Sequence, residues 1–218
     1  MSQPSIAIVD YGVGNLNSVA NMIRRAGADA RFVRTPAEVR QAERLVLPGV
    51  GAFDACRRSL DQIDGLEMAI RDAVERDVPL LGICVGMQML ATSSEEGCLA
   101  GLDLVPGRVR RFDLQGMAAS QSLRVPHMAW CPVEPRGRST LFTGELSELN
   151  RFYFVHSYYF ECTNPDDKAG VARHGLKFTA AVERDRVYGV QFHPEKSHRY
   201  GLALFHNFAA LPVGRAHA

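Results

Sequence analysis

The sequence lacks the features that tie a protein to a membrane, a nucleic acid or a metal ion. None of its apolar runs approaches the roughly 20 residues of a membrane-spanning helix. Basic and acidic side chains are almost balanced, 25 against 24, so no charge excess would hold a polyanion. Its five cysteines form no Cys-x-x-Cys pair and no zinc spacing. We therefore predict a cytoplasmic protein with reduced thiols, no metal, and no nucleic-acid or membrane partner.

Length and composition predict one domain. With 218 residues, 46% of them hydrophobic, the chain can bury one sizeable core but is short for two domains and a linker. The first ten residues show no basic segment and no small-residue cleavage site, so we expect no secretory signal peptide. We expect a single domain over residues 1–218, with a tail that frays after about residue 211.

Short apolar runs alternate with amphipathic segments along the chain. We expect strands at residues 6–9, 32–33, 45–47, 78–83, 108–112, 152–156, 178–182 and 187–192. We expect helices between Asn15 as N-cap and Gly27, from the capping box of Thr35 and Glu38 onward, and at 53–60, 65–76 and 84–90. A closing helix should turn Leu202, Phe205 and either Phe208 or Ala209 inward. Residues 115–121 and 164–168 are expected loops. This order predicts an α/β fold with a central, mostly parallel sheet flanked by helices.

The strongest local signal is Cys84, which lies between Gly82 and Gly86 where a strand passes into a helix. A sharp strand-to-helix turn of this kind exposes a nucleophile, and glycines leave room for the turn. The helix N-terminus favours the thiolate, and the N–H of Val85 is placed to stabilise an oxyanion. A lone cysteine is more often a buried core residue, but a glycine on each side favours the nucleophile.

His193 and Glu195 follow the last predicted strand and are separated by Pro194. A thiolate nucleophile needs a proton carrier, and a carboxylate can orient that carrier's imidazole. The same residues with nearby His198 also resemble a metal site, but no third well-spaced ligand is present, so we favour a Cys84, His193 and Glu195 triad.

The sequence contains three glycine-rich segments, which differ in what they predict. Val50 and Gly51 follow the third strand, where their N–H groups could face an oxyanion or form only a tight turn. Nucleotide loops are excluded, because Asn17 replaces the third glycine of a dinucleotide motif and Leu176 replaces the lysine of a P-loop.

The single tryptophan, Trp130, is either a core residue or an interface anchor.

Five segments together resemble the class I (triad) glutamine amidotransferases, whose fold is flavodoxin-like, and among them the glutaminase subunits of imidazole glycerol phosphate synthase. These segments are Asp10–Leu16, Pro48–Phe53, Gly82–Gln88, Phe152–Tyr158 and Gln191–Ser197. The resemblance implies a glutaminase without a cofactor, in which Cys84 forms a γ-glutamyl thioester, His193 moves protons and Glu195 orients His193. It also implies oxyanion donors at Val50, Gly51 and Val85, and glutamine contacts from Gln88, His156, Ser157 and Tyr158.

The same resemblance implies a partner. It predicts a heterodimer with a (βα)₈-barrel cyclase of histidine biosynthesis, which receives ammonia past Asn15, Trp130, Tyr153 and Lys196. Two alternatives stay open: a paralogue that feeds a sugar-amidating synthase, and a non-catalytic regulatory subunit. The chain departs from the family's usual Gly and Asn at Ala129 and Cys131, on either side of Trp130.

Overall fold

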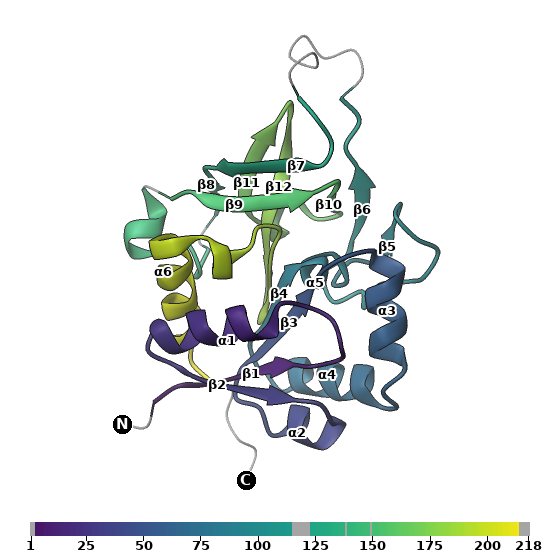
Figure 1. The fold of residues 1–218 in the computed structure, drawn as a ribbon, viewed down its shortest axis with the longest axis vertical. Helices are drawn as coiled ribbons and strands as arrows, with labels where there is room; N and C mark the ends of the chain where they lie inside the picture. The colour runs from purple at the N-terminus through teal and green to yellow at the C-terminus, as the bar shows by residue number, and fades with distance from the viewer. Residues whose placement is uncertain (1–2, 115–122, 138, 149, 214–218) are drawn as a thin grey trace.

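The central sheet begins with five parallel strands, in a computed structural model that describes residues 3–114, 123–137, 139–148 and 150–213 (Figure 1). In spatial order they are β2 (Asp29–Val33), β1 (Ser5–Val9), β3 (Leu45–Gly49), β4 (Leu80–Cys84) and β13 (Val187–Val190). Every residue of β3, β4 and β13 is buried. Strands covered on both faces need apolar side chains on both, which explains their continuous apolar sequences.

Strands that pair antiparallel extend the sheet beyond β13, and one short strand that pairs parallel ends it. They continue through β12 (Leu176–Arg184), β10 (Tyr158–Cys162) and β6 (Gly107–Arg111) to the short β5 (Ser93–Ser94), while β11 (Lys168–His174) pairs with β12 and with β8 (Glu134–Pro135). A separate ribbon of β7 (His127–Cys131) and β9 (Phe152–His156) lies across the end of the central sheet (Figure 1). The fold is therefore a mixed sheet, parallel in its first half.

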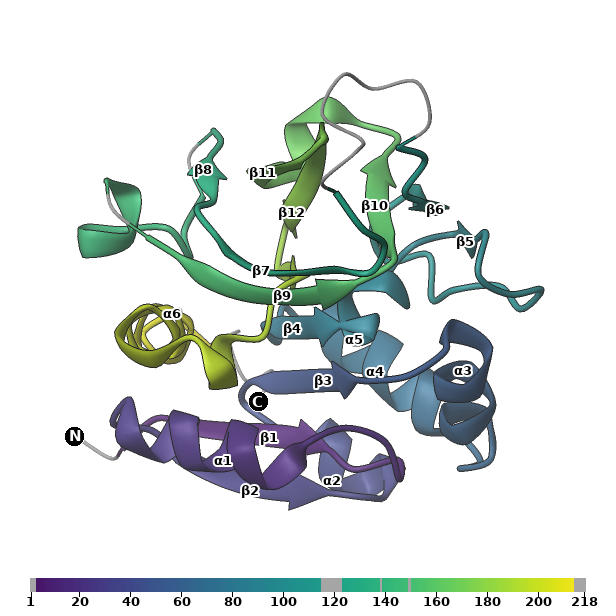
Figure 2. The same cartoon turned by 45° about the horizontal axis from the view of Figure 1, so that its top comes forward.

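Two groups of helices enclose the parallel strands (Figure 2). α1 (Leu16–Arg25) packs against α6 (His198–Ala209), and α4 (Leu66–Glu75) packs against both α2 (Pro36–Arg40) and α3 (Phe53–Asp61). α5 (Val85–Gln88) is a single turn that contacts β3 and β4. Three 3₁₀ turns, η1 (Gly144–Ser147), η2 (Pro165–Asp167) and η3 (Pro194–Lys196), complete the elements.

The structure confirms the predicted order of elements and corrects several details. The helix predicted over residues 84–90 ends at Gln88, because the following residues form turns. In the closing helix Phe205 and Phe208 are buried as predicted, but Leu202 is only half-buried and Leu204 lies inward in its place. Strands β5, β7, β8, β10 and β11 were not predicted, and the expected loop at 164–168 contains the 3₁₀ turn η2 and the first residue of β11. The predicted loop at 115–121 and residues 214–218 of the predicted frayed tail lie outside the described residues.

Across the part of the chain that the structure describes, no helix is long and apolar enough to cross a membrane.

The two predicted helix caps differ, which makes them a test of local stability. Thr35 forms the complete capping box with Glu38, whereas Asn15 occupies the N-cap position of α1 without a side-chain hydrogen bond. Thr35→Ala should therefore lower the free energy of unfolding by about 1 kcal/mol, and Asn15→Ala by less than about 0.5 kcal/mol. Urea denaturation of the two variants measures the difference, and equal losses would contradict this assignment of the caps.

Candidate functional site

The site forms where the carboxyl ends of three parallel strands meet. Gly49 at the end of β3 is paired with Cys84 at the end of β4, and Val190 at the end of β13 is paired with Ile83. The segments that follow these strands therefore converge, as ligand sites of parallel sheets commonly do. They carry Val50 with Gly51, Cys84, and Gln191 with His193.

Cys84 lies at a sharp turn between β4 and α5, as the sequence predicted. Its φ of 55° lies in the left-handed region, which is rare for a residue with a side chain. A Cβ on Gly82 would lie 2.7 Å from the carbonyl oxygen of Gly86, and a Cβ on Gly86 would overlap the carbonyl oxygen of Leu47. Gly49, which the sequence analysis did not single out, is required for the same reason, since its Cβ would overlap the backbone nitrogen of Gly86.

His193 and Glu195 are bonded to each other. The Nδ1 of His193 lies 2.8 Å from Oε1 of Glu195, and both side chains are almost completely buried. Because Nδ1 is bonded to Glu195, Nε2 is the nitrogen left to contact Cys84. Burial by itself would lower the pKa of His193, but the hydrogen bonds and negative charges of Cys84 and Glu195 outweigh it and raise that pKa to about 10. A positively charged imidazole beside the sulfur stabilises a thiolate.

This charge matters because α5 is shorter than predicted. A helix of four residues sums few peptide dipoles, so the imidazolium of His193 replaces the expected helix as the main positive charge near Cys84.

A cavity of about 390 Å³ opens over Cys84. Its lining includes nearly all of the predicted catalytic, oxyanion and glutamine-contacting residues: Val50, Gly51, Cys84, Val85, Gln88, His156, Ser157, Tyr158 and His193, with Lys196. Glu195 does not line the cavity and lies behind His193. Three residues that were not predicted complete the wall, namely Glu96, Pro126 and Val155.

Glu96 is the most important residue that sequence reasoning missed. Its carboxylate accepts a hydrogen bond from the backbone N–H of Phe53 at 3.0 Å, and burial raises the pKa of Glu96. Glu96 lies in a polar turn after β5, and nothing in that turn distinguishes it from neighbouring Glu95. Only the folded chain places Glu96 in the same cavity as Cys84.

Gln88 and Gln191 form a buried pair beside Cys84. The Nε2 of Gln88 donates to the Tyr158 carbonyl at 3.1 Å and to Oε1 of Gln191 at 3.0 Å. The Nε2 of Gln191 donates to the sulfur of Cys84 at 3.8 Å. Both hydrogens of the Gln88 amide are therefore used within the protein, and only its oxygen is left for a ligand.

Two side chains hold the loop that follows β3. The hydroxyl of Tyr11 donates to the Pro48 carbonyl, and the thiol of Cys56 donates to the Val50 carbonyl at 3.4 Å. Burial raises the pKa of Tyr11, which keeps its phenol protonated as a donor. The loop is fixed on its inner side, while the side chain of Val50 is exposed.

An aromatic group lies beside the cavity on β7, β9 and the start of α6. Trp130 stacks on His198 with ring centroids 5.3 Å apart and tilts against Tyr153 at 5.9 Å. The ammonium of Lys196 lies 5.8 Å from the centre of the Tyr153 ring. Three of the four predicted interface residues are therefore neighbours. The fourth, Asn15, is exposed at the start of α1, which packs against η3.

Ala129 and Cys131 flank Trp130 on β7. Ala129 pairs with Phe154 of β9, and the thiol of Cys131 donates to the Arg173 carbonyl at 3.6 Å. Cys131 thus connects β7 to β11.

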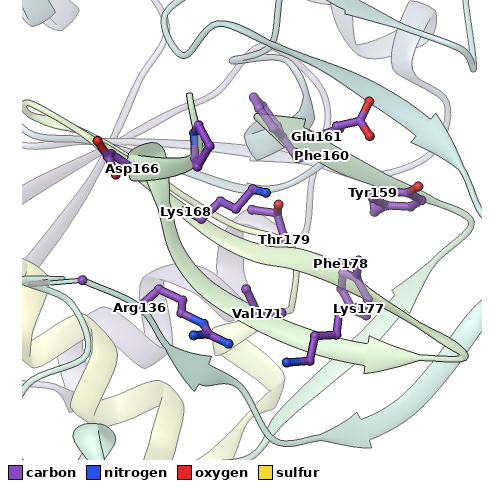
Figure 3. Close-up of a pocket in the computed structure, with 12 residues that line it drawn as sticks. Arg136, Tyr159, Phe160, Glu161, Asp166, Lys168, Val171, Lys177, Phe178 and Thr179 are labelled. Carbon is purple, nitrogen blue, oxygen red and sulfur yellow. The ribbon is translucent and has the colours of Figure 1, made fainter. Parts of the chain in front are cut away.

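A second, wider cavity of about 730 Å³ shares no lining residue with the first. Its side chains come from β10, β11, β12, the turn η2 and the residues that follow β8, and they include Arg136, Lys168 and Lys177 (Figure 3). Arg136 and Lys177 both form ion pairs with Glu134. This cavity contains no cysteine or histidine, so we assign no chemistry to it. Among the described residues no group of His, Cys, Asp and Glu is arranged to hold a metal ion.

The parallel sheet and the cavity over Cys84 agree with the comparison with known families. Residues 7–210 match the family "Glutamine amidotransferase class-I". The chain belongs to this family.

Within this family, the chain is similar over nearly its whole length to proteins of one name. The chain is 48% identical over 207 residues to a Bdellovibrio bacteriovorus protein named imidazole glycerol phosphate synthase subunit HisH, covering 94% of this chain and 100% of the relative. It is 49% identical to the protein of the same name from Nitrosospira multiformis, over 93% and 96% of the two chains. Among solved structures, PurLQS from Thermotoga maritima matches with a TM-score of 0.69 over 95% and 98% of the chains, and its 18% identity supports the fold alone.

Three histidines form a cluster next to the cavity. The Nδ1 of His127 lies 3.0 Å from Nε2 of His156, and the ring of His174 stacks on His127 with centroids 4.2 Å apart. Burial lowers the pKa of His156 to about 3, and burial with the nearby charge of His174 lowers the pKa of His127 to about 4. His127 and His156 are therefore neutral in the folded protein at physiological pH.

The lowered pKa values of His127 and His156 predict that the folded protein loses stability in acid. Between about pH 6.5, where unfolded histidines titrate, and about pH 4, the unfolded chain binds protons that folded His127 and His156 do not. The free energy of unfolding should therefore fall as pH decreases through this window. Urea denaturation at pH 7 and pH 5 measures the loss, which should be smaller in His156→Gln. The exposed His206 on α6 provides the control, since His206→Asn should behave like the parent. Equal losses in the His156 variant and the parent would contradict the prediction.

Proposed function

We propose that this chain is the glutaminase subunit of an imidazole glycerol phosphate synthase, which hydrolyses glutamine and passes ammonia to a separate cyclase subunit in histidine biosynthesis. The observation that carries this proposal is the geometry of Cys84, held at a strained turn beside the bonded pair of His193 and Glu195. The chain is 48% and 49% identical, over more than nine tenths of its length, to two proteins named HisH, which supports the choice of this synthase over other amidotransferases.

The first half of the reaction forms a thioester. The Cys84 thiolate attacks the side-chain amide carbon of glutamine and produces a tetrahedral oxyanion. The N–H groups of Val85 and of the Val50–Gly51 loop line the same cavity and are the candidate oxyanion donors. As the carbon–nitrogen bond breaks, Nε2 of His193 gives its proton to the leaving group, which departs as ammonia.

The second half releases glutamate. His193, now neutral, takes a proton from a water molecule, which attacks the thioester carbonyl. The carbon–sulfur bond then breaks, and the thiolate and the imidazolium are restored. Glu195 is bonded to Nδ1 throughout, so it keeps Nε2 directed at the reacting atoms and stabilises the charged imidazole.

The cavity wall offers complementary groups for glutamine. Its α-ammonium group requires an anion or acceptor, and Glu96 is the one carboxylate in the lining. The Gln88 oxygen is free to accept a hydrogen bond, because both Gln88 amide hydrogens are used by Tyr158 and Gln191. The backbone of Ser157 and Tyr158 forms the remaining polar edge.

The aromatic group on β7 and β9 is the proposed docking site of the cyclase, a (βα)₈ barrel. Trp130 and Tyr153 present large rings, and Lys196 lines the cavity while it lies near the Tyr153 ring. A contact at this position would seal the cavity mouth, which serves the reaction because ammonia released into water would be protonated and lost. Asn15 would extend this surface from α1.

Replacement of the nucleophile tests the proposal directly. With a cyclase partner present, Cys84→Ala should reduce glutamate release from glutamine to background, because no other thiol lines the cavity. Cys98→Ala is the matched control, since Cys98 is an exposed free thiol and its loss should leave turnover unchanged. A coupled glutamate assay measures both. Turnover that persists in Cys84→Ala would refute the assignment.

The role of Glu195 predicts a change in His193. Glu195→Gln keeps the shape of the side chain but removes its charge, so the pKa of His193 should fall and kcat should decrease on the order of 10²- to 10⁴-fold. An NMR titration of His193 and steady-state kinetics provide the two measurements. Glu161→Gln is the control, because Glu161 is exposed and pairs with Arg110. An unchanged His193 titration in Glu195→Gln would exclude the proposed role.

A further inference from the structure

A continuous chain of hydrogen bonds runs from the β7–β9 ribbon to the sulfur of Cys84. It passes from His127 to His156, from His156 to the Tyr158 carbonyl, and from that carbonyl through Gln88 and Gln191 to Cys84. Its side chains are buried, Gln191 completely and Gln88 with 2% of its surface exposed. We call this chain of six groups the relay.

The direction of each bond in the relay follows from one fixed group, the Tyr158 carbonyl, which can only accept. His156 Nδ1 lies 2.7 Å from this oxygen and must therefore carry the hydrogen. Nε2 of the neutral His156 then has a lone pair, which accepts from Nδ1 of His127. The outer half of the relay thus permits a single tautomer of His156.

The same oxygen fixes the inner half. The Gln88 amide group, not its oxygen, must point at the Tyr158 carbonyl, and its second hydrogen meets Oε1 of Gln191. Gln191 consequently presents its own amide hydrogens to Cys84. A flipped Gln191 would instead place a carbonyl oxygen against the sulfur, which would repel a thiolate.

We propose that Gln191 positions and stabilises the Cys84 thiolate by donating to its sulfur, and that His127, acting through His156, is a positioning residue for the glutamine cavity. A donor to an ionised sulfur strengthens as the charge forms, so Gln191 favours the state that attacks glutamine. His127 acts at a distance by holding the His156 tautomer that anchors the Tyr158 carbonyl. This inference rests on Cys84 being the nucleophile of the proposed glutaminase.

Alkylation of Cys84 tests the inner half. The full chain is treated with iodoacetamide across a pH series, and modification of Cys84 is followed by mass spectrometry. Gln191→Met, which is similar in shape but has no donor, should move the pH midpoint of alkylation upward by about one unit and lower kcat by about tenfold. Gln191→Glu keeps the shape and places a negative charge at the sulfur, so its midpoint should move further in the same direction.

The results separate this inference from the proposed function. If the unmodified protein turns over glutamine through Cys84 while both Gln191 variants keep its alkylation midpoint, the inner half of the relay is refuted and the glutaminase stands. If the protein fails to hydrolyse glutamine with its partner, the proposed function itself fails. The Gln191→Glu variant protects the test against a folding defect in Gln191→Met, because the acceptor for Gln88 is retained.

A matched pair tests the outer half. His127→Phe removes the donor to His156, whereas His127→Asn can place its amide nitrogen where Nδ1 of His127 lies. The Phe variant should raise the KM for glutamine several-fold with little change in kcat, and the Asn variant should restore much of the loss. Equal KM values for the two variants would overturn the role of His127, since a space-filling role would favour Phe over Asn.

Discussion

The close contact between α5 and the ends of β3 and β4 is the constraint on which the site depends. At Gly49, Gly82 and Gly86 the backbones approach so closely that a Cβ at any of the three would collide with main-chain atoms. This contact forces the chain to reverse at Cys84, whose left-handed φ is tolerated because the surrounding strands are fixed. A buried parallel sheet supplies that rigidity, since β3, β4 and β13 are covered on both faces.

The positive charge near Cys84, the proposed nucleophile, comes from a side chain more than from the helix. α5 is one turn long, so its dipole is small, and the positive charge beside Cys84 belongs to His193. That charge persists because Glu195 is buried with it and bonded to Nδ1. The opposite condition holds at His127 and His156, which are buried without a carboxylate partner and are neutral. His193 is therefore charged whereas His127 and His156 are neutral, although all three histidines are buried.

The sequence predicted the parts of the site that short-range rules determine. The glycines around Cys84, the His193–Glu195 spacing and the parallel strands are all visible within a few residues. The missed parts join residues that are far apart in the chain, such as Gln88 with Gln191 and Glu96 with Phe53. The length of α5 was also missed, because the apolar residues after Gln88 continue the helical pattern although their backbone forms turns. No periodic pattern encodes a single long-range hydrogen bond, so these features become visible only after folding.

The β7–β9 ribbon carries both the aromatic group around Trp130 and the outer end of the relay that leads to the sulfur of Cys84. β7 begins with His127, the outer end of the relay, and three residues later carries Trp130 of the aromatic group. Its neighbour β9 carries Tyr153 and ends at His156, so both strands contribute one residue to each feature. The ladder between the two strands couples their positions, and each hydrogen bond of the relay has only one allowed donor. A protein that contacted Trp130 and Tyr153 would therefore touch the same two strands that carry His127 and His156, which places the proposed docking surface next to the outer end of the proposed relay.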